Sequence, residues 1–118
     1  MKVETRPSGI HGTGVFATEA IRRGEVVLHI DDSRIVDGDH PVREDLGESP
    51  DHCDWLPDGT TVLMQPPECY INHSCGPNVF VYSVGRTRFV LASRRICTGE
   101  EIVYDYAVNA INGDTCGR

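Results

Sequence analysis

The sequence contains no long apolar run and no apolar stretch behind the charges of its first seven residues. Its longest apolar segments, such as residues 79–82, are far shorter than the roughly 20 residues that a membrane-spanning helix needs. The N-terminus does not match a signal peptide. We therefore expect a soluble, intracellular protein without membrane contact, cytoplasmic or, in a eukaryote, nuclear. Its 118 residues suit one domain with a modest core.

Cysteines at metal-binding or redox spacing are also missing. The five cysteines, Cys53, Cys69, Cys75, Cys97 and Cys116, are odd in number and include no C-x-x-C pair. This pattern favours reduced thiols in a reducing compartment over a disulfide framework.

Basic charge is scarce as well. The formal net charge of −7 argues against direct binding to a nucleic-acid backbone, which needs a basic surface. The acid is concentrated between Asp31 and Asp58, where ten carboxylates stand against two arginines. Such a stretch can attract a basic peptide. It can also be a solvated loop that keeps the protein soluble, which the sequence alone favours.

Short β-strands separated by glycine turns dominate the pattern. Strands are predicted at residues 2–5, 15–17, 26–30, 60–64, 79–84, 88–92 and 102–104, with 79–84 and 88–92 forming a hairpin. Residues 31–60 lack periodicity and are predicted to form a long loop with a short helical turn near 43–46. Residues 21–27 and 96–103 echo each other, since each is a turn closed by glycine that starts an apolar strand.

A glycine-rich segment, GIHGTGVFA, occupies residues 9–17. Its G-x-x-G-x-G order and the lack of a helix pattern after it argue against a dinucleotide-binding βαβ unit. Gly12 and Gly14 would let the backbone approach a ligand closely, because no side chain stands in the way. A plain tight turn between two strands explains the same glycines.

The most informative segment is YINHSCGPN at residues 70–78. Asn72 has an amide that both donates and accepts hydrogen bonds. His73 and Cys75 form an H-x-C pair that looks like half a metal site, but a second pair at suitable spacing is missing, so a structural histidine is favoured. Further on, GEEIVYDY at residues 99–106 places Tyr104 and Tyr106 on one face of a presumed strand.

In this order the three segments closely resemble the SET-domain family of protein lysine methyltransferases, over residues 8–106. The resemblance implies a mainly β fold of several small sheets, a β-clip, with a knot-like crossing of the C-terminal segment. It divides the chain into a SET domain at residues 1–108 and a short tail at 109–118. We interpret the tail as a remnant of the post-SET segment found in relatives.

The resemblance also implies S-adenosylmethionine as the cofactor. The positions that match the family's cofactor residues are Gly12, Thr13, Gly14, Tyr70, Asn72, His73 and Tyr106. By the same resemblance, Tyr106 orients the methyl donor near the developing charge, and Tyr104 limits the number of methyl groups added. The target lysine must be neutral and aligned with the methyl group. For Tyr70 and Tyr104, packing in the hydrophobic core is a credible alternative to a functional role. It is a weaker alternative for Tyr106.

Two departures from the family pattern affect the expected site and partners. Many relatives hold a zinc ion between three later cysteines and the cysteine matching Cys75, whereas here only Cys116 follows, so no metal is predicted. The last twelve residues contain no aromatic to cover the cofactor. Either the chain is a fragment, or a second subunit of a homodimer or the substrate supplies the lid.

The expected reaction is methylation of a lysine in a basic segment of a protein substrate, such as a histone or another basic protein. The alternative is a non-catalytic SET-like module that binds a peptide or a partner.

Overall fold

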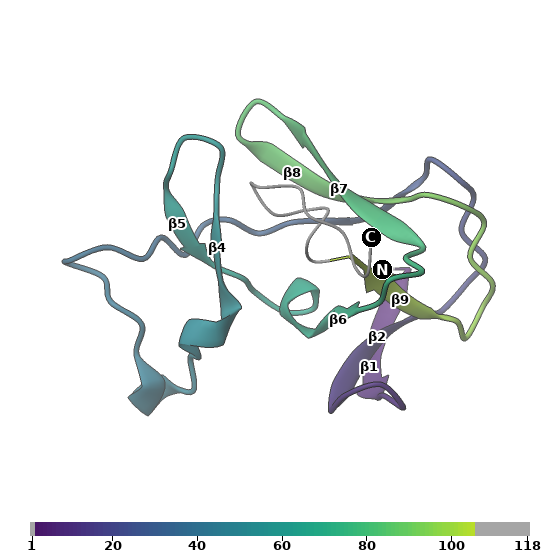
Figure 1. The fold of residues 1–118 in the computed structure, drawn as a ribbon, viewed down its shortest axis with the longest axis horizontal. Coiled ribbons are helices and arrows are strands. Elements are labelled where there is room, and N and C mark those ends of the chain that lie inside the picture. The colour runs from purple at the N-terminus through teal and green to yellow at the C-terminus, as the bar shows by residue number, and fades with distance from the viewer. Residues whose placement is uncertain (1, 106–118) are drawn as a thin grey trace.

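Three small β-sheets build the molecule in the computed structural model, which describes residues 2–105 (Figure 1). The first sheet has the strand order β1-β2-β9-β6. Its strands are β1 (Val3–Pro7), β2 (Thr13–Ala17), β6 (Asn72–His73) and β9 (Glu101–Tyr104). β9 lies between an antiparallel partner, β2, and a parallel partner, β6. A segment from the end of the chain is therefore central to a sheet that begins at residue 3.

The second sheet has the order β3-β8-β7 and contains the predicted hairpin. β3 (Val26–His29) pairs with β8 (Thr87–Ala92), which pairs with β7 (Val79–Val84). The hairpin prediction is confirmed with a two-residue loop, because Thr87 already belongs to β8. Gly85 in this loop has φ +61°, a value that few residues other than glycine adopt readily.

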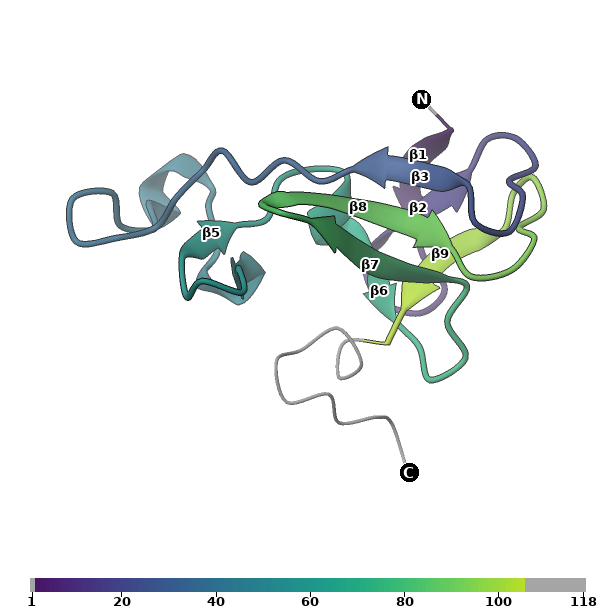
Figure 2. The same cartoon turned by 90° about the horizontal axis from the view of Figure 1, so that it is seen from above.

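The third sheet lies in the acidic region and corrects the sequence prediction. The sequence predicts residues 31–60 as a long loop with a short helical turn near 43–46. That turn is present as η1 (Glu44–Leu46), but the region also contains η2 (Pro50–His52) and β4 (Cys53–Trp55). β4 pairs with β5 (Thr61–Leu63). The region that contains them, residues 31–63, extends away from the other sheets and is called the insert below (Figures 1 and 2). β4 escaped prediction because its three residues, Cys-Asp-Trp, show no alternation of their own and gain strand geometry only from pairing with β5.

The two echoed turns meet in space. Ile21 and Ile96 exchange backbone hydrogen bonds of 2.9 Å in both directions, and both side chains are fully buried. The glycines that close the turns, Gly24 and Gly99, have nearly the same φ, +82° and +84°. The bridge between the two turns thus holds the segment before β3 against the segment before β9.

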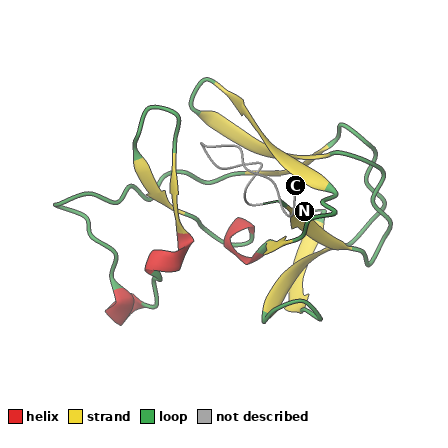
Figure 3. Cartoon of the chain, viewed as in Figure 1, coloured by secondary structure: helices red, strands yellow, loops and turns green. Residues whose placement is uncertain are grey.

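The core lies between the first two sheets. Its buried members are Val3, Val15, Ala17, Ile21, Val27, Leu28, Ile30, Ile71, Val79, Val90, Ala92, Ile96, Ile102 and Tyr104. Figure 3 shows how few helical residues surround these strands, three short 3-10 turns in the described part of the chain. No helix among the described residues is long and apolar enough to cross a membrane.

The loop after β6 wraps the C-terminal strand, which is where the resemblance implies the knot-like crossing. Ser74 N donates to Tyr104 O at 3.0 Å, and Asn78 N donates to Val103 O at 3.1 Å. The Asn78 side chain, 1% exposed, completes the attachment, since its Oδ1 accepts from Val103 N at 2.9 Å and its Nδ2 donates to Glu101 O at 2.8 Å. Among the described residues, the fold is therefore mainly β and built of several small sheets.

Candidate functional site

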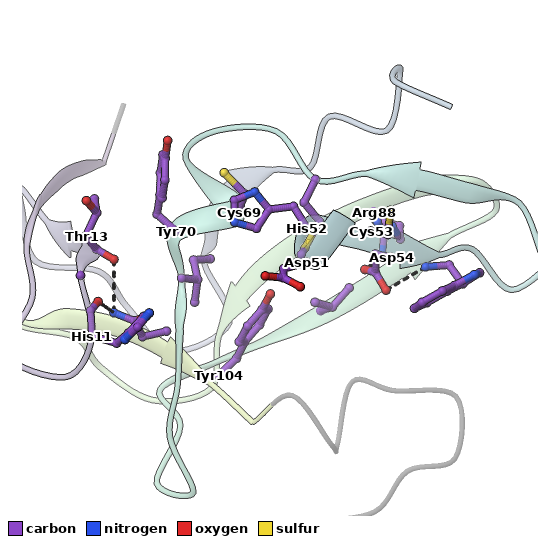
Figure 4. A pocket seen from close by; sticks show the side chains of 16 residues that line it. His11, Thr13, Asp51, His52, Cys53, Asp54, Cys69, Tyr70, Arg88 and Tyr104 are labelled. Carbon is purple, nitrogen blue, oxygen red and sulfur yellow. Dashed lines mark hydrogen bonds and ion pairs between the residues drawn. The ribbon is translucent and has the colours of Figure 1, made fainter. Parts of the chain in front are cut away.

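A cavity of about 930 Å³ lies between three parts of the chain: residues 8–14, which we call the glycine loop, the η3–β6 segment and the insert (Figure 4). η3 spans Glu68–Tyr70. The residues that line the cavity are His11, Gly12, Thr13, Asp51, His52, Cys53, Asp54, Trp55, Met64, Cys69, Tyr70, Ile71, Asn72, Val81, Arg88 and Tyr104. Three segments that are distant in sequence thus share one hollow, large enough for a drug-sized ligand.

Five of the residues predicted for the site line this cavity: Gly12, Thr13, Tyr70, Asn72 and Tyr104. Gly14 and His73 do not. Tyr106 lies outside the described residues, as do the 109–118 tail and Cys116. The binding roles assigned to all of these residues stay predictions.

The Asn72 amide has a defined direction. Its Nδ2 donates to Glu101 Oε2 at 2.9 Å, to His11 O at 3.0 Å, to Ser8 Oγ at 3.1 Å and to Thr13 O at 3.4 Å. Three of these partners can only accept, so the nitrogen must face them. Within residues 2–105, no group donates to Asn72 Oδ1, which leaves that oxygen as the acceptor that a ligand can use.

Ser8 and Glu101 were missed from the sequence, although they hold the glycine loop in place. Ser8 Oγ lies 2.9 Å from both carboxylate oxygens of Glu101, and Ser8 N donates to Gly12 O at 2.7 Å. Gly12 has φ +46° and no heavy atom within 4 Å of the position of a Cβ. Gly12 thus allows the left-handed backbone conformation of the turn, and no other atom occupies the space where its side chain would lie. The only available signal for Glu101 was its place in the GEEIVYDY segment.

His73 lies next to β9 rather than in the cavity. Its Nδ1 is 4.0 Å from Oδ1 of the buried Asp105, and its Nε2 is 3.8 Å from Cys75 Sγ. Among residues 2–105, no group of three or more His, Cys, Asp or Glu side chains is arranged to hold a metal ion.

Aromatic rings of the core and the insert meet at the cavity. Tyr104 is buried, and in Figure 4 its ring points toward the side where Asp51 of the insert lies. Tyr70 is 37% exposed and meets the ring of His52 edge-on, with centroids 6.3 Å apart. The insert therefore forms a wall of the cavity rather than a detached loop.

A charge cluster of Arg88, Asp32 and Asp54 holds this wall against the second sheet. Arg88 of β8, 6% exposed, donates to Asp32 at 2.6 and 2.9 Å and to Asp54 at 3.0 Å. The two hydrogen bonds to Asp32, and after them the one to Asp54, hold the pKa of Arg88 above its usual value. Arg88 thereby ties the central strand of the second sheet to β4 and to the start of the insert.

Glu68 is the third carboxyl near Arg88, and it is 2% exposed. Its Oε1 has no hydrogen-bond partner among the described residues. Burial, which disfavours the charged form, raises the pKa of Glu68 to about 7, against the opposing effect of Arg88. Glu68 therefore keeps its proton well above the pH at which an exposed glutamate loses it.

Replacing Glu68 by glutamine is expected to stabilise the protein above pH 7 and to leave it unchanged near pH 4. Between the ordinary pKa of 4.5 and the folded value of about 7, the unfolded chain releases a proton that the folded protein retains. Stability therefore falls as pH rises through this window, by about 3 kcal/mol in total. Glutamine stays neutral and removes this loss. Urea unfolding at pH 4 to 8 measures it.

The matched control is Glu44→Gln, which changes an exposed glutamate of η1. This variant should follow the wild-type pH profile. Equal stability of Glu68→Gln and wild type at pH 8 would contradict a neutral, buried Glu68.

Comparison with known proteins gives a consistent result. The SET-domain family matches residues 12–107. The H3 lysine-4 specific histone-lysine N-methyltransferase of Schizosaccharomyces pombe is 35% identical over 85% of this chain and 12% of its own length. The trithorax histone-lysine N-methyltransferase of Drosophila virilis is 32% identical over 84% of this chain and 3% of its own. The chain thus spans a small part of both relatives.

Solved structures share the fold. A Plasmodium falciparum candidate histone methyltransferase has a TM-score of 0.67 at 22% identity and covers 89% of this chain and 92% of its own. The structure of ctPRC2 in an autoinhibited conformation bound to S-adenosylmethionine has a TM-score of 0.70 at 25% identity, covering 93% of this chain and 16% of its own.

Proposed function

Because this chain belongs to the SET-domain family, we propose that it methylates the ε-amine of a lysine in a protein substrate, with S-adenosylmethionine as methyl donor. The SET domain is homologous to those of histone-lysine methyltransferases. A histone or another basic protein is the substrate class we propose, which would favour a nuclear location. A homodimer in which one subunit covers the other's cofactor stays a prediction.

One observation carries the proposal: the cavity joins the glycine loop, the directed amide of Asn72 and the ring of Tyr104. Asn72 Oδ1 is available to accept from the amine of an amino-acid moiety, and Gly12 leaves the loop open toward a ligand. The residues present therefore fit S-adenosylmethionine, which would supply an electrophilic methyl group when bound.

The residues of the chain would then bind and orient. Gly12 and Thr13 would offer backbone groups, and Asn72 an amide oxygen, to the methionine end. Gly14, Tyr70 and His73 remain proposed contacts on the pattern of the family. Tyr104 would line the lysine channel and restrict how many methyl groups fit, while Tyr106 would orient the donor. An apolar channel lowers the pKa of a lysine, which favours the neutral amine that attacks.

The acidic insert supports a basic substrate. Asp51 of the insert lines the same cavity as the glycine loop, so its carboxylate would be able to meet a basic substrate segment. Opposite charge of this kind speeds association and selects partners.

Calorimetry with S-adenosylmethionine, followed by incubation of labelled cofactor with histones, tests the function. We expect the wild type to bind the cofactor and to transfer the label to lysine. Asn72→Ala should weaken binding about tenfold, because the buried amine of the ligand loses its acceptor.

Ser74→Ala serves as the control, since its hydroxyl serves the loop by accepting from Gly76 N and does not line the cavity. Wild-type protein that neither binds the cofactor nor transfers a methyl group would favour the non-catalytic binding module instead.

A further inference from the structure

We propose that Glu101 is a positioning residue that sets the direction of the Asn72 amide and the shape of the glycine loop. The consequence for cofactor binding rests on the proposed function. The packing role does not, because it concerns contacts within the chain.

The geometry begins with an amide that has two hydrogens and four acceptors around its nitrogen. The two shortest contacts of Asn72 Nδ2 are those to Glu101 Oε2, 2.9 Å, and to His11 O, 3.0 Å. His11 belongs to the loop itself, whereas Glu101 comes from β9, a separate and central strand. Glu101 therefore binds both the Asn72 amide and Ser8 of the glycine loop from a strand outside the loop.

A carboxylate suits this task because it can only accept. If the Asn72 amide turned over, its Oδ1 would face Glu101 Oε2, and two acceptors would repel each other. No lysine, arginine or histidine within residues 2–105 forms a salt bridge with Glu101. Its side-chain partners there are the neutral groups of Ser8 and Asn72. Its negative charge is thus directed at these two donors and at the loop they hold.

Gly14 supplies independent support. A Cβ at this position would lie inside contact distance of Glu101 Oε2 and 2.9 Å from Ser8 Cβ. Its φ is not in the left-handed region, so glycine is not needed for the backbone conformation. Gly14 is explained by the carboxylate of Glu101, which occupies the space of the missing side chain.

The test compares S-adenosylhomocysteine binding by Glu101→Ala, Asn72→Ala and the double variant, using the whole chain. If Glu101 acts through Asn72, we expect Glu101→Ala to weaken binding about tenfold. The double variant should then bind no more than about threefold more weakly than Asn72→Ala alone. The proposal would be overturned if the fold-loss in affinity of the double variant equalled the product of the two single losses. It would also be overturned if Glu101→Ala bound within twofold of the wild type.

Glu100→Ala is the matched control, because it removes the neighbouring carboxylate, which pairs with Arg94 instead. Its binding should equal that of the wild type. Should Glu101→Ala fail to fold, Ser8→Ala takes its place, since it removes one of the two donors to the same carboxylate. We expect a loss of about threefold in Ser8→Ala, and unchanged binding in it would count against the proposal.

A ligand-free measurement separates this proposal from the function. In NMR spectra of the free protein, the Asn72 side-chain NH₂ should be protected from exchange in wild type and Glu100→Ala, and exposed in Glu101→Ala or Ser8→Ala. Failure of the wild type to bind would remove the proposed function alone. An NH₂ signal that stays protected in Glu101→Ala would overturn the role of Glu101 whatever the protein binds.

Discussion

Replacing Arg88 by methionine is expected to destabilise the protein by about 3 kcal/mol at pH 8, the order found when one partner of a buried ion pair is removed. Methionine keeps much of the stem but leaves Asp32, Asp54 and Glu68 without the guanidinium that they surround. The loss should be smaller near pH 4, because Glu68, with a pKa of about 7, is then protonated and adds no unpaired negative charge. Urea unfolding at both pH values measures the difference.

Arg86→Met is the matched control from the same hairpin. Arg86 pairs with Asp58, but both side chains are largely exposed, and exposed pairs contribute about 1 kcal/mol or less. If Arg88→Met and Arg86→Met lose equal stability, Arg88 does not anchor the insert in the way that its burial indicates.

Replacing Tyr106 by phenylalanine is expected to lower methyl transfer about a hundredfold while the fold survives. The size is that of one electrostatic contact made in the transition state. The assignment rests on the GEEIVYDY segment and on membership of the family, because Tyr106 lies outside the residues that the structure describes. Single-turnover transfer from labelled cofactor measures the rate, and thermal unfolding checks the fold.

Tyr104→Phe is the companion variant on the same segment. Tyr104 lines the cavity and is buried, so loss of its hydroxyl should release space in the lysine channel. We expect mainly monomethyl product from the wild type and a shift to di- or trimethyl product in Tyr104→Phe, with turnover retained. Mass spectrometry of the product peptides measures the methylation state. Trimethyllysine as the main early product of the wild type would show that Tyr104 does not limit the number of methyl groups.

Much of the fold could be predicted from the sequence. The strands that became β5, β7, β8 and β9 were evident from short apolar runs between glycines. The order of the three motifs was enough to indicate the family, and the family match over residues 12–107 confirms it. These features are local, since a strand pattern, a left-handed glycine or a motif depends on residues next to one another.

The relation between the motifs needed the tertiary structure. β4 became a strand only by pairing with β5. Ile21 forms a single bridge with Ile96, which lies 75 residues later in the chain. The partners of Arg88 are Asp32 and Asp54, which the sequence shows only as members of an acidic stretch.

What the sequence by itself determined is which chemical groups this protein has and which family they indicate. The direction of the Asn72 amide, the reason for Gly14 and the burial of Glu68 were decided only by the tertiary structure. The first two depend on Glu101, which another strand supplies, and the third depends on the folded chain that removes the Glu68 carboxyl from water. Hydrogen-bond direction and desolvation arise from such long-range contacts, which no local pattern of residues records.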